Sequence, residues 1–214
     1  MSRARLIWLG VFSMAMAYLE SAVVVYLRAL YYPGGFAFPI IIIPDAMAAI
    51  EVGREAATIV MLAALAWLAG SNKWQRFLVF CICFGVWDIS YYFWLWVFLG
   101  WPPSLMTWDI LFLIPVPWMG PVLAPVLVSV AMIAGSARLL HLQAAGRAIS
   151  FSLLHWSLAL LGGLLVLLSF MLDFRVALNG AMPPPFRWWL FAAGMASAVC
   201  GLVAGVKALE RPPA

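Results

Sequence analysis

Charged residues are scarce in this chain of 214 residues. Only 9% of the residues are charged, whereas 67% are hydrophobic. A soluble domain is usually about 45–50% apolar and about 25% charged, and a chain of this length cannot form a core large enough to bury so many apolar side chains. The composition therefore predicts a protein whose main solvent is lipid.

Histidine is nearly absent, and the cysteines have no metal-binding or redox spacing. The two histidines, His141 and His155, lie apart in the sequence, and Cys81, Cys83 and Cys200 form no C-x-x-C motif. Haem and zinc sites usually need histidine or cysteine ligands, so the sequence argues against both. If a metal binds, a shell of oxygen ligands suits a divalent cation such as Mg²⁺, Ca²⁺ or Mn²⁺.

The sequence shows neither a cleavable signal peptide nor a basic patch. The N-terminal apolar run continues to about Tyr26 without a small-residue cleavage site, so we expect it to remain as the first span. The net charge is +4, but the basic residues are distributed over loops and termini. This distribution argues against a nucleic-acid partner.

The main feature of the sequence is six long apolar runs. We expect an all-α fold, a single domain of about six transmembrane helices in contact with membrane lipids. The 12 tryptophans and 6 tyrosines are consistent with this fold, because their rings favour the membrane–water interface. The expected spans are residues 6–27, 46–69, 77–99, 121–139, 149–172 and 188–209.

Two shorter apolar stretches, residues 31–46 and 101–121, precede the second and fourth spans. Both contain proline and glycine, and proline opposes a continuous helix. We expect two broken or re-entrant segments on one side of the membrane, covered by protein or lining a wet cavity. In the second stretch, Thr107 or Asp109 is suited to cap a short helix.

Basic residues in the loops predict the orientation. With six spans, eight basic residues fall on the side of the termini and three on the opposite side. The positive-inside rule then places both termini in the cytoplasm, and the frequent use of Ala, Gly and Arg suggests a bacterial inner membrane. The first group is Arg3, Arg5, Lys73, Arg76, Arg138, Arg147, Lys207 and Arg211, and the second is Arg28, Arg175 and Arg187.

Acidic residues converge on the outer half of the predicted bundle, although they come from four separate stretches of the chain. On the second span, Arg54, Glu55 and Thr58 fall within a ~100° stripe together with Glu51. A polar stripe on a membrane helix faces other helices or a cavity rather than lipid. The five acids are Glu20, Glu51, Glu55, Asp88 and Asp109.

These acids outnumber the nearby cations. A charge at mid-span costs ~2.5–3.5 kcal/mol on the lenient insertion scale. Arg54 can neutralise one acid, and Arg28, near the boundary, can neutralise a second. Up to three carboxyl groups must therefore be hydrated, protonated or bound to a cation.

We therefore predict an outer-facing site that binds or transports a cation, a proton-coupled solute or an amphiphile. Two alternatives remain open: a membrane-embedded enzyme acting on a lipid or isoprenoid, and an accessory subunit in which the acids form a structural ion-pair knot. Any metal would be held by Glu51, Glu55 and Asp88. The predicted binding residues are Glu20, Glu51, Arg54, Glu55, Asp88, Tyr92 and Asp109.

Small residues on two spans predict close helix packing. Gly85 shares a face with Asp88 and allows a neighbouring helix to approach. The last span has small residues at four-residue spacing, which favours packing inside the protomer, in a homo-oligomer or against another membrane subunit. These residues are Ala193, Ser197, Gly201 and Gly205.

Overall fold

The computed structural model describes residues 1–210, so Arg211 lies outside the described residues. This part of the chain is mostly helical, with six helical segments long and apolar enough to cross a membrane, which suggests a membrane location. The segments are α1 (Arg3–Tyr31), α2 (Asp45–Ala69), α3 (Lys73–Leu99), α4 (Leu123–Ala144), α5 (Leu153–Met171) with the short α6 (Phe174–Leu178), and α7 (Trp188–Glu210).

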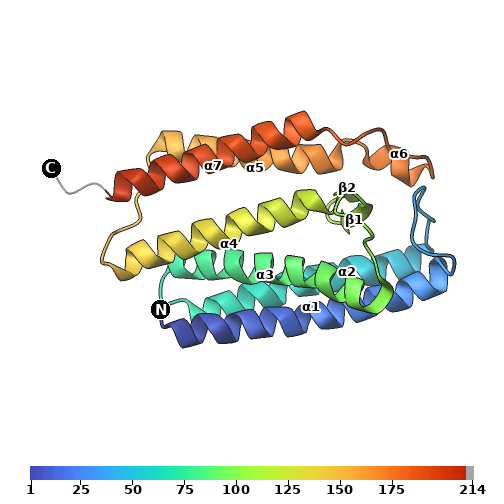
Figure 1. Cartoon of the computed structure of the whole chain (residues 1–214), viewed down its shortest axis with the longest axis horizontal. Helices are drawn as coiled ribbons and strands as arrows, with labels where there is room; N and C mark the ends of the chain where they lie inside the picture. The colour runs from blue at the N-terminus through green and yellow to red at the C-terminus, as the bar shows by residue number, and fades with distance from the viewer. Residues whose placement is uncertain (211–214) are drawn as a thin grey trace.

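Both ends of the described chain lie at the same end of the bundle (Figure 1). The α2–α3 and α4–α5 connections lie there too. The opposite end carries the α1–α2 connection, a small β-hairpin and α6. An even number of membrane crossings places both ends of a chain on the same side, as observed for the described residues.

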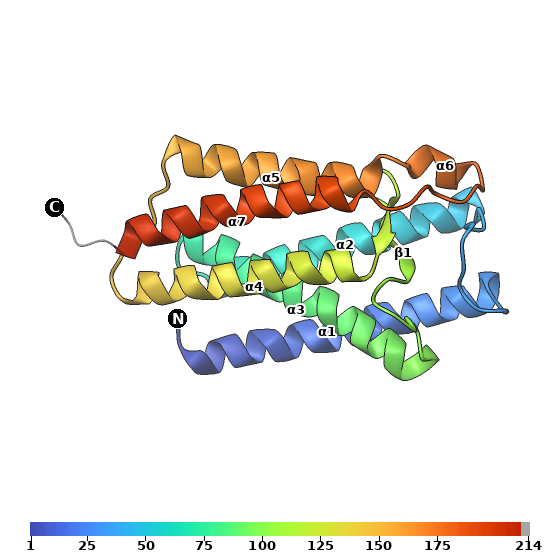
Figure 2. The ribbon, with the colours of Figure 1, turned by 45° about the horizontal axis from the view of Figure 1, so that its top comes forward.

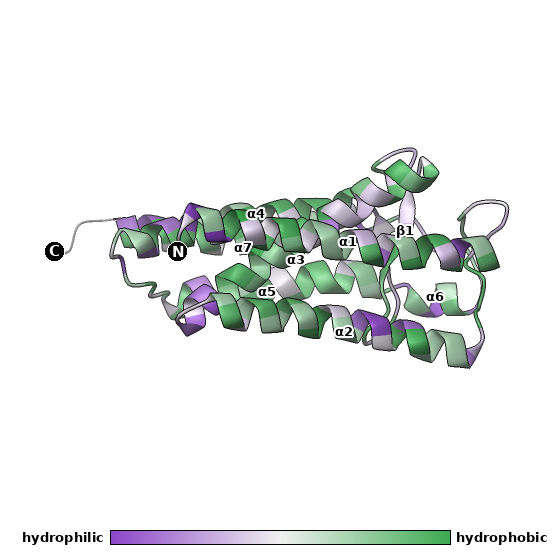
Figure 3. Ribbon diagram, turned by 90° about the horizontal axis from the view of Figure 1, so that it is seen from below, coloured by the Kyte–Doolittle hydropathy of each residue, from purple (hydrophilic) through white to green (hydrophobic). Residues whose placement is uncertain are grey.

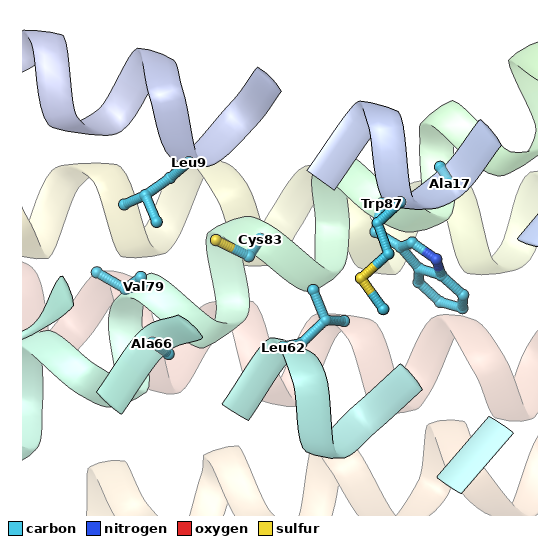
Figure 4. Packing of buried hydrophobic residues seen from close by; sticks show 8 residues of the cluster. Leu9, Ala17, Leu62, Ala66, Val79, Cys83 and Trp87 are labelled. Atoms are coloured by element: carbon cyan, nitrogen blue, oxygen red, sulfur yellow. The ribbon is translucent and has the colours of Figure 1, made fainter. Parts of the chain in front are cut away.

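Helix α3 is the centre of the bundle, because it packs against α1, α2 and α4. Helices α5 and α7 form a closely packed pair along one side of the molecule (Figures 1 and 2). Three helices meet in the main apolar cluster (Figure 4). Its labelled residues are Leu9 and Ala17 of α1, Leu62 and Ala66 of α2, and Val79, Cys83 and Trp87 of α3.

Many large apolar side chains face outward. Leu68 and Leu153, for example, are 85% and 83% exposed. Figure 3 shows hydrophobic colour along most of the helices, with hydrophilic colour near the end that carries the termini and in a separate patch on α2. Side chains on such an outer surface are stable in lipid, where apolar groups lose nothing by exposure.

The helices extend beyond several of the predicted spans. Helix α4 continues to Ala144, five residues past the predicted end, and α1 has 29 residues. A helix of that length spans about 43 Å, which exceeds the ~30 Å hydrocarbon core. Backbone hydrogen bonding continues through polar residues, so helix ends need not coincide with the ends of apolar runs.

The segment before α4 is a β-hairpin, so the predicted short helix capped by Thr107 or Asp109 is wrong. Strand β1 (Trp108–Phe112) pairs antiparallel with β2 (Trp118–Pro121), and Asp109 lies opposite Gly120. Two prolines at positions 115 and 117 interrupt the chain between the strands, where they oppose helix formation. Strand pairing then satisfies backbone groups that would otherwise lie unpaired.

Glycines bring two helix pairs into close contact. A Cβ atom on Gly85 of α3 would lie 2.8 Å from the Ser129 carbonyl oxygen of α4, which confirms the predicted close approach. On α7, Gly201 lies against Leu158, and Gly205 lies against Phe151. Gly201 and Gly205 of the small-residue face therefore pack inside the chain, as does Ser197, which bonds the Leu158 carbonyl oxygen, and we propose no oligomer on this face.

Candidate functional site

A partly open cavity of about 410 Å³ lies toward the end of the bundle opposite the termini. Small-molecule sites usually have volumes of about 300–1,000 Å³. Helices α1, α2 and α3, the β-hairpin and the α1–α2 connection all contribute to its wall. The wall includes all seven predicted binding residues: Glu20, Glu51, Arg54, Glu55, Asp88, Tyr92 and Asp109.

Arg54 joins α2 to α1. Its guanidinium forms ion pairs with Glu20 of α1 and with Glu51 one turn away on α2. Thr58, one turn further along α2, donates a hydrogen bond of 2.6 Å to Oε1 of Glu20. The polar stripe predicted on α2 thus faces the protein interior, and one arginine serves two acids.

Glu55 lies on the same stripe and has a different kind of partner. Its Oε2 atom accepts a hydrogen bond of 2.8 Å from the backbone N–H of Leu113, which follows β1. The residue is only 7% exposed, and it forms no ion pair among residues 1–210. A buried carboxyl group is thus held in place by a neutral donor.

Asp88 of α3 also has a neutral partner. Its Oδ2 atom accepts a hydrogen bond of 2.8 Å from the hydroxyl group of Ser129 on α4. The close approach at Gly85 brings this part of α4 near enough for that contact. Within the described part of the chain, Asp88 has no ion-pair partner either.

A second arginine joins α1 to the hairpin. Nη2 of Arg28 lies 3.2 Å from Oδ1 of Asp109. The guanidinium also lies over two rings, 3.7 Å from the centroid of Trp101 and 4.4 Å from that of Phe36, an arrangement that favours arginine over lysine. Burial raises the pKa of Asp109 to about 7, although Arg28 and the Tyr92 hydroxyl act in the opposite direction.

The cavity therefore contains more acids than cations. Six carboxyl groups line the cavity, the five predicted acids and Asp45, whereas only two guanidinium groups do, and both guanidinium groups already have acidic partners. Glu55 and Asp88 are the two acids with only neutral hydrogen-bond donors. This arrangement can attract and neutralise a positively charged guest.

A metal ion fits the arrangement less well. In residues 1–210, no group of three His, Cys, Asp or Glu side chains is close enough to hold a metal ion. Glu51, Glu55 and Asp88, the residues predicted to hold any metal, therefore do not form a metal-binding group, although all three line the same cavity. The wall also contains many apolar side chains, including Val24, Leu27 and residues 40–43, which suit an organic guest.

Several contributors to the cavity were not among the predicted site residues. Tyr91 and Thr58 line it, Ser129 supports Asp88, and Arg28 pairs with Asp109. Arg28 lies eight residues after Glu20, about 80° around α1 and so within the same broad helix face, which is a signal in the sequence. The backbone N–H of Leu113 could not be predicted from the sequence in this way, because every residue except proline has a backbone N–H group.

Comparison with known proteins gives no match. No family model, no curated protein and no solved structure is significantly similar to this chain.

Proposed function

We propose that this chain is an integral membrane protein that binds a small organic cation in the 410 Å³ cavity. One observation supports the proposal above all. Glu55 and Asp88 line the cavity with hydrogen bonds from neutral donors only and form no ion pair among residues 1–210, while both cavity arginines are ion-paired with other acids. A cationic guest would neutralise these two acids and place its apolar part against the apolar wall.

The structural ion-pair knot accounts for only part of the arrangement. It describes Arg54 with Glu20 and Glu51, which fasten α1 to α2. It gives no reason for a cavity of this size, or for the buried acids Glu55 and Asp88 in its wall, which form no ion pair among residues 1–210. Binding of a cation accounts for both features.

We further propose a bacterial inner membrane, with the termini in the cytoplasm and the cavity opening outward. Basic residues support this orientation: Arg3, Lys73 and Arg147 belong to the end with the termini, whereas the cavity lies toward the other end. In membrane proteins, the loops on the cytoplasmic side carry an excess of lysine and arginine.

Binding of three molecules of similar shape tests the proposal. The protein would be reconstituted in lipid nanodiscs and titrated calorimetrically with n-butylammonium, n-butanol and butyrate. We expect saturable binding of n-butylammonium only. Glu55→Gln and Asp88→Asn should each weaken it tenfold or more, because a hydrogen bond to a charged group contributes about 1.5–3 kcal/mol.

Glu210→Gln provides the matched control, because Glu210 lies at the opposite end of the bundle and pairs with Arg138. It should leave n-butylammonium binding unchanged. Absence of n-butylammonium binding by the wild-type protein, or equal affinity in the Glu55 and Asp88 variants, would refute the proposal.

A further inference from the structure

A second cavity of about 140 Å³ adjoins the first. It lies among α2, α3, the hairpin, α4 and α5. Four residues line both cavities, namely Trp87, Asp88, Leu111 and Phe112. Asp88 is therefore the acid that a guest in either cavity can reach.

The rest of the second cavity is apolar apart from Ser129, which bonds Asp88. One side is a rigid aromatic wall, because Trp118 and Phe170 stack with their ring planes 10° apart. An apolar cavity of about 150 Å³ is large enough to hold benzene. The remaining wall residues are Ile59, Phe84, Pro125 and Val128.

Two tryptophans of this wall have unused hydrogen-bond donors. The indole N–H groups of Trp87 and Trp118 are buried, and neither has an acceptor among residues 1–210. Leaving a buried donor unpaired is unfavourable. An aromatic guest can accept a weak N–H···π bond, which a saturated guest of the same volume cannot do.

We propose that the second cavity holds an aromatic ring joined by a short chain to the cation in the first cavity, so that the ligand is an arylalkylammonium ion. This inference rests on the proposed function and names the class of its ligand. Asp88, shared by the two cavities, would bind the ammonium group, and Glu55 on the wall of the first cavity would add a second negative charge there. The volume limits the aromatic part to a single ring, and the tryptophan donors favour an aromatic ring over a saturated one.

Three ammonium compounds test this inference in the same nanodiscs: n-butylammonium, 4-phenylbutylammonium and 4-cyclohexylbutylammonium. We expect the phenyl compound to bind at least tenfold more tightly than n-butylammonium, and more tightly than the cyclohexyl compound. Because the cyclohexyl compound is at least as hydrophobic, non-specific partitioning into lipid would not give this order.

Filling the cavity provides the structural test. Val128→Phe and, from the opposite wall, Ile59→Phe should reduce the preference for phenyl over n-butyl from tenfold to less than threefold. Val130→Phe is the matched control, because Val130 is on the same helix, 50% exposed and outside both cavities. It should retain the full preference.

The outcomes separate the two proposals. If n-butylammonium binds and depends on Glu55, but phenyl gives no gain or the filled variants retain it, the second-cavity inference is wrong and the proposed function stands. Equal affinity for the phenyl and cyclohexyl compounds would also overturn the assignment of an aromatic ring. If no ammonium compound binds to the wild-type protein, both proposals fail.

Discussion

The carboxylate of Glu55 accepts a hydrogen bond of 2.8 Å from the backbone N–H of Leu113, 58 residues further along the chain. This contact attaches the β-hairpin to α2. It also fixes the position of an acid that forms no ion pair among the described residues. The hairpin therefore has two roles: it forms part of the site, and its strand pairing satisfies backbone hydrogen-bonding groups in a non-helical segment.

The hairpin should loosen when its acceptor is removed. In Glu55→Ala, amide hydrogen exchange in residues 108–121 should accelerate about tenfold, because a hydrogen bond to a charged group is worth about 1.5–3 kcal/mol. Glu55→Gln retains a carbonyl oxygen and should keep most of the protection. Equal exchange in the alanine variant and the wild type would show that the contact does not hold the hairpin.

Arg54 should be more costly to remove alone than together with an acidic partner. Arg54→Gln leaves Glu20 and Glu51 without their cation, and breaking a buried pair costs about 3–5 kcal/mol. Adding Glu20→Gln should recover at least half of the lost thermal stability. The measurement is a double-mutant cycle of unfolding in detergent, and strictly additive losses would contradict the ion pair.

Asp109 should make stability depend on pH. Burial raises its pKa from the usual 3.8 to about 7, so the folded state holds this proton more tightly than the unfolded state does. Its contribution to stability is complete below about pH 4 and is lost as the pH rises to about 7. Asp109→Asn should flatten the fall in unfolding temperature over this range, whereas a slope unchanged from the wild type would argue against the shift.

Gly85→Ala should separate α3 from α4. The added Cβ atom would lie 2.8 Å from the Ser129 carbonyl oxygen, and overpacking of this kind costs about 1–3 kcal/mol. Because Ser129 also bonds Asp88, n-butylammonium affinity should fall together with the unfolding temperature. Gly163→Ala is the matched control, since nothing lies within 4 Å of its added Cβ atom, and an equal effect there would exclude a specific clash.

The composition and the 3.6-residue repeat were enough to predict a membrane bundle and to place one polar stripe. Glu51, Arg54, Glu55 and Thr58 share a face because helical geometry is local, and the structure places all four on the cavity wall. The grouping of Glu20, Asp88 and Asp109 with them was also predictable, because each was assigned to the outer half of the bundle.

The hairpin was not predictable by the same reasoning. Residues 108–121 have no helical repeat, and strand pairing depends on a partner segment rather than on local spacing. The contacts of Arg28 with Trp101 and Phe36 likewise join the end of α1 and the α1–α2 connection to a segment more than 60 residues away. Neither arrangement leaves a periodic trace in the sequence.

The sequence by itself determined that the chain forms apolar helices and that its buried acids exceed the cations available to them, because both are properties of composition and helical spacing. Only the tertiary structure decided which acids the arginines neutralise: Glu20, Glu51 and Asp109 are paired, whereas Glu55 and Asp88 are not. Ion pairs form over a few ångströms, and the packing of helices and hairpin sets distances on that scale.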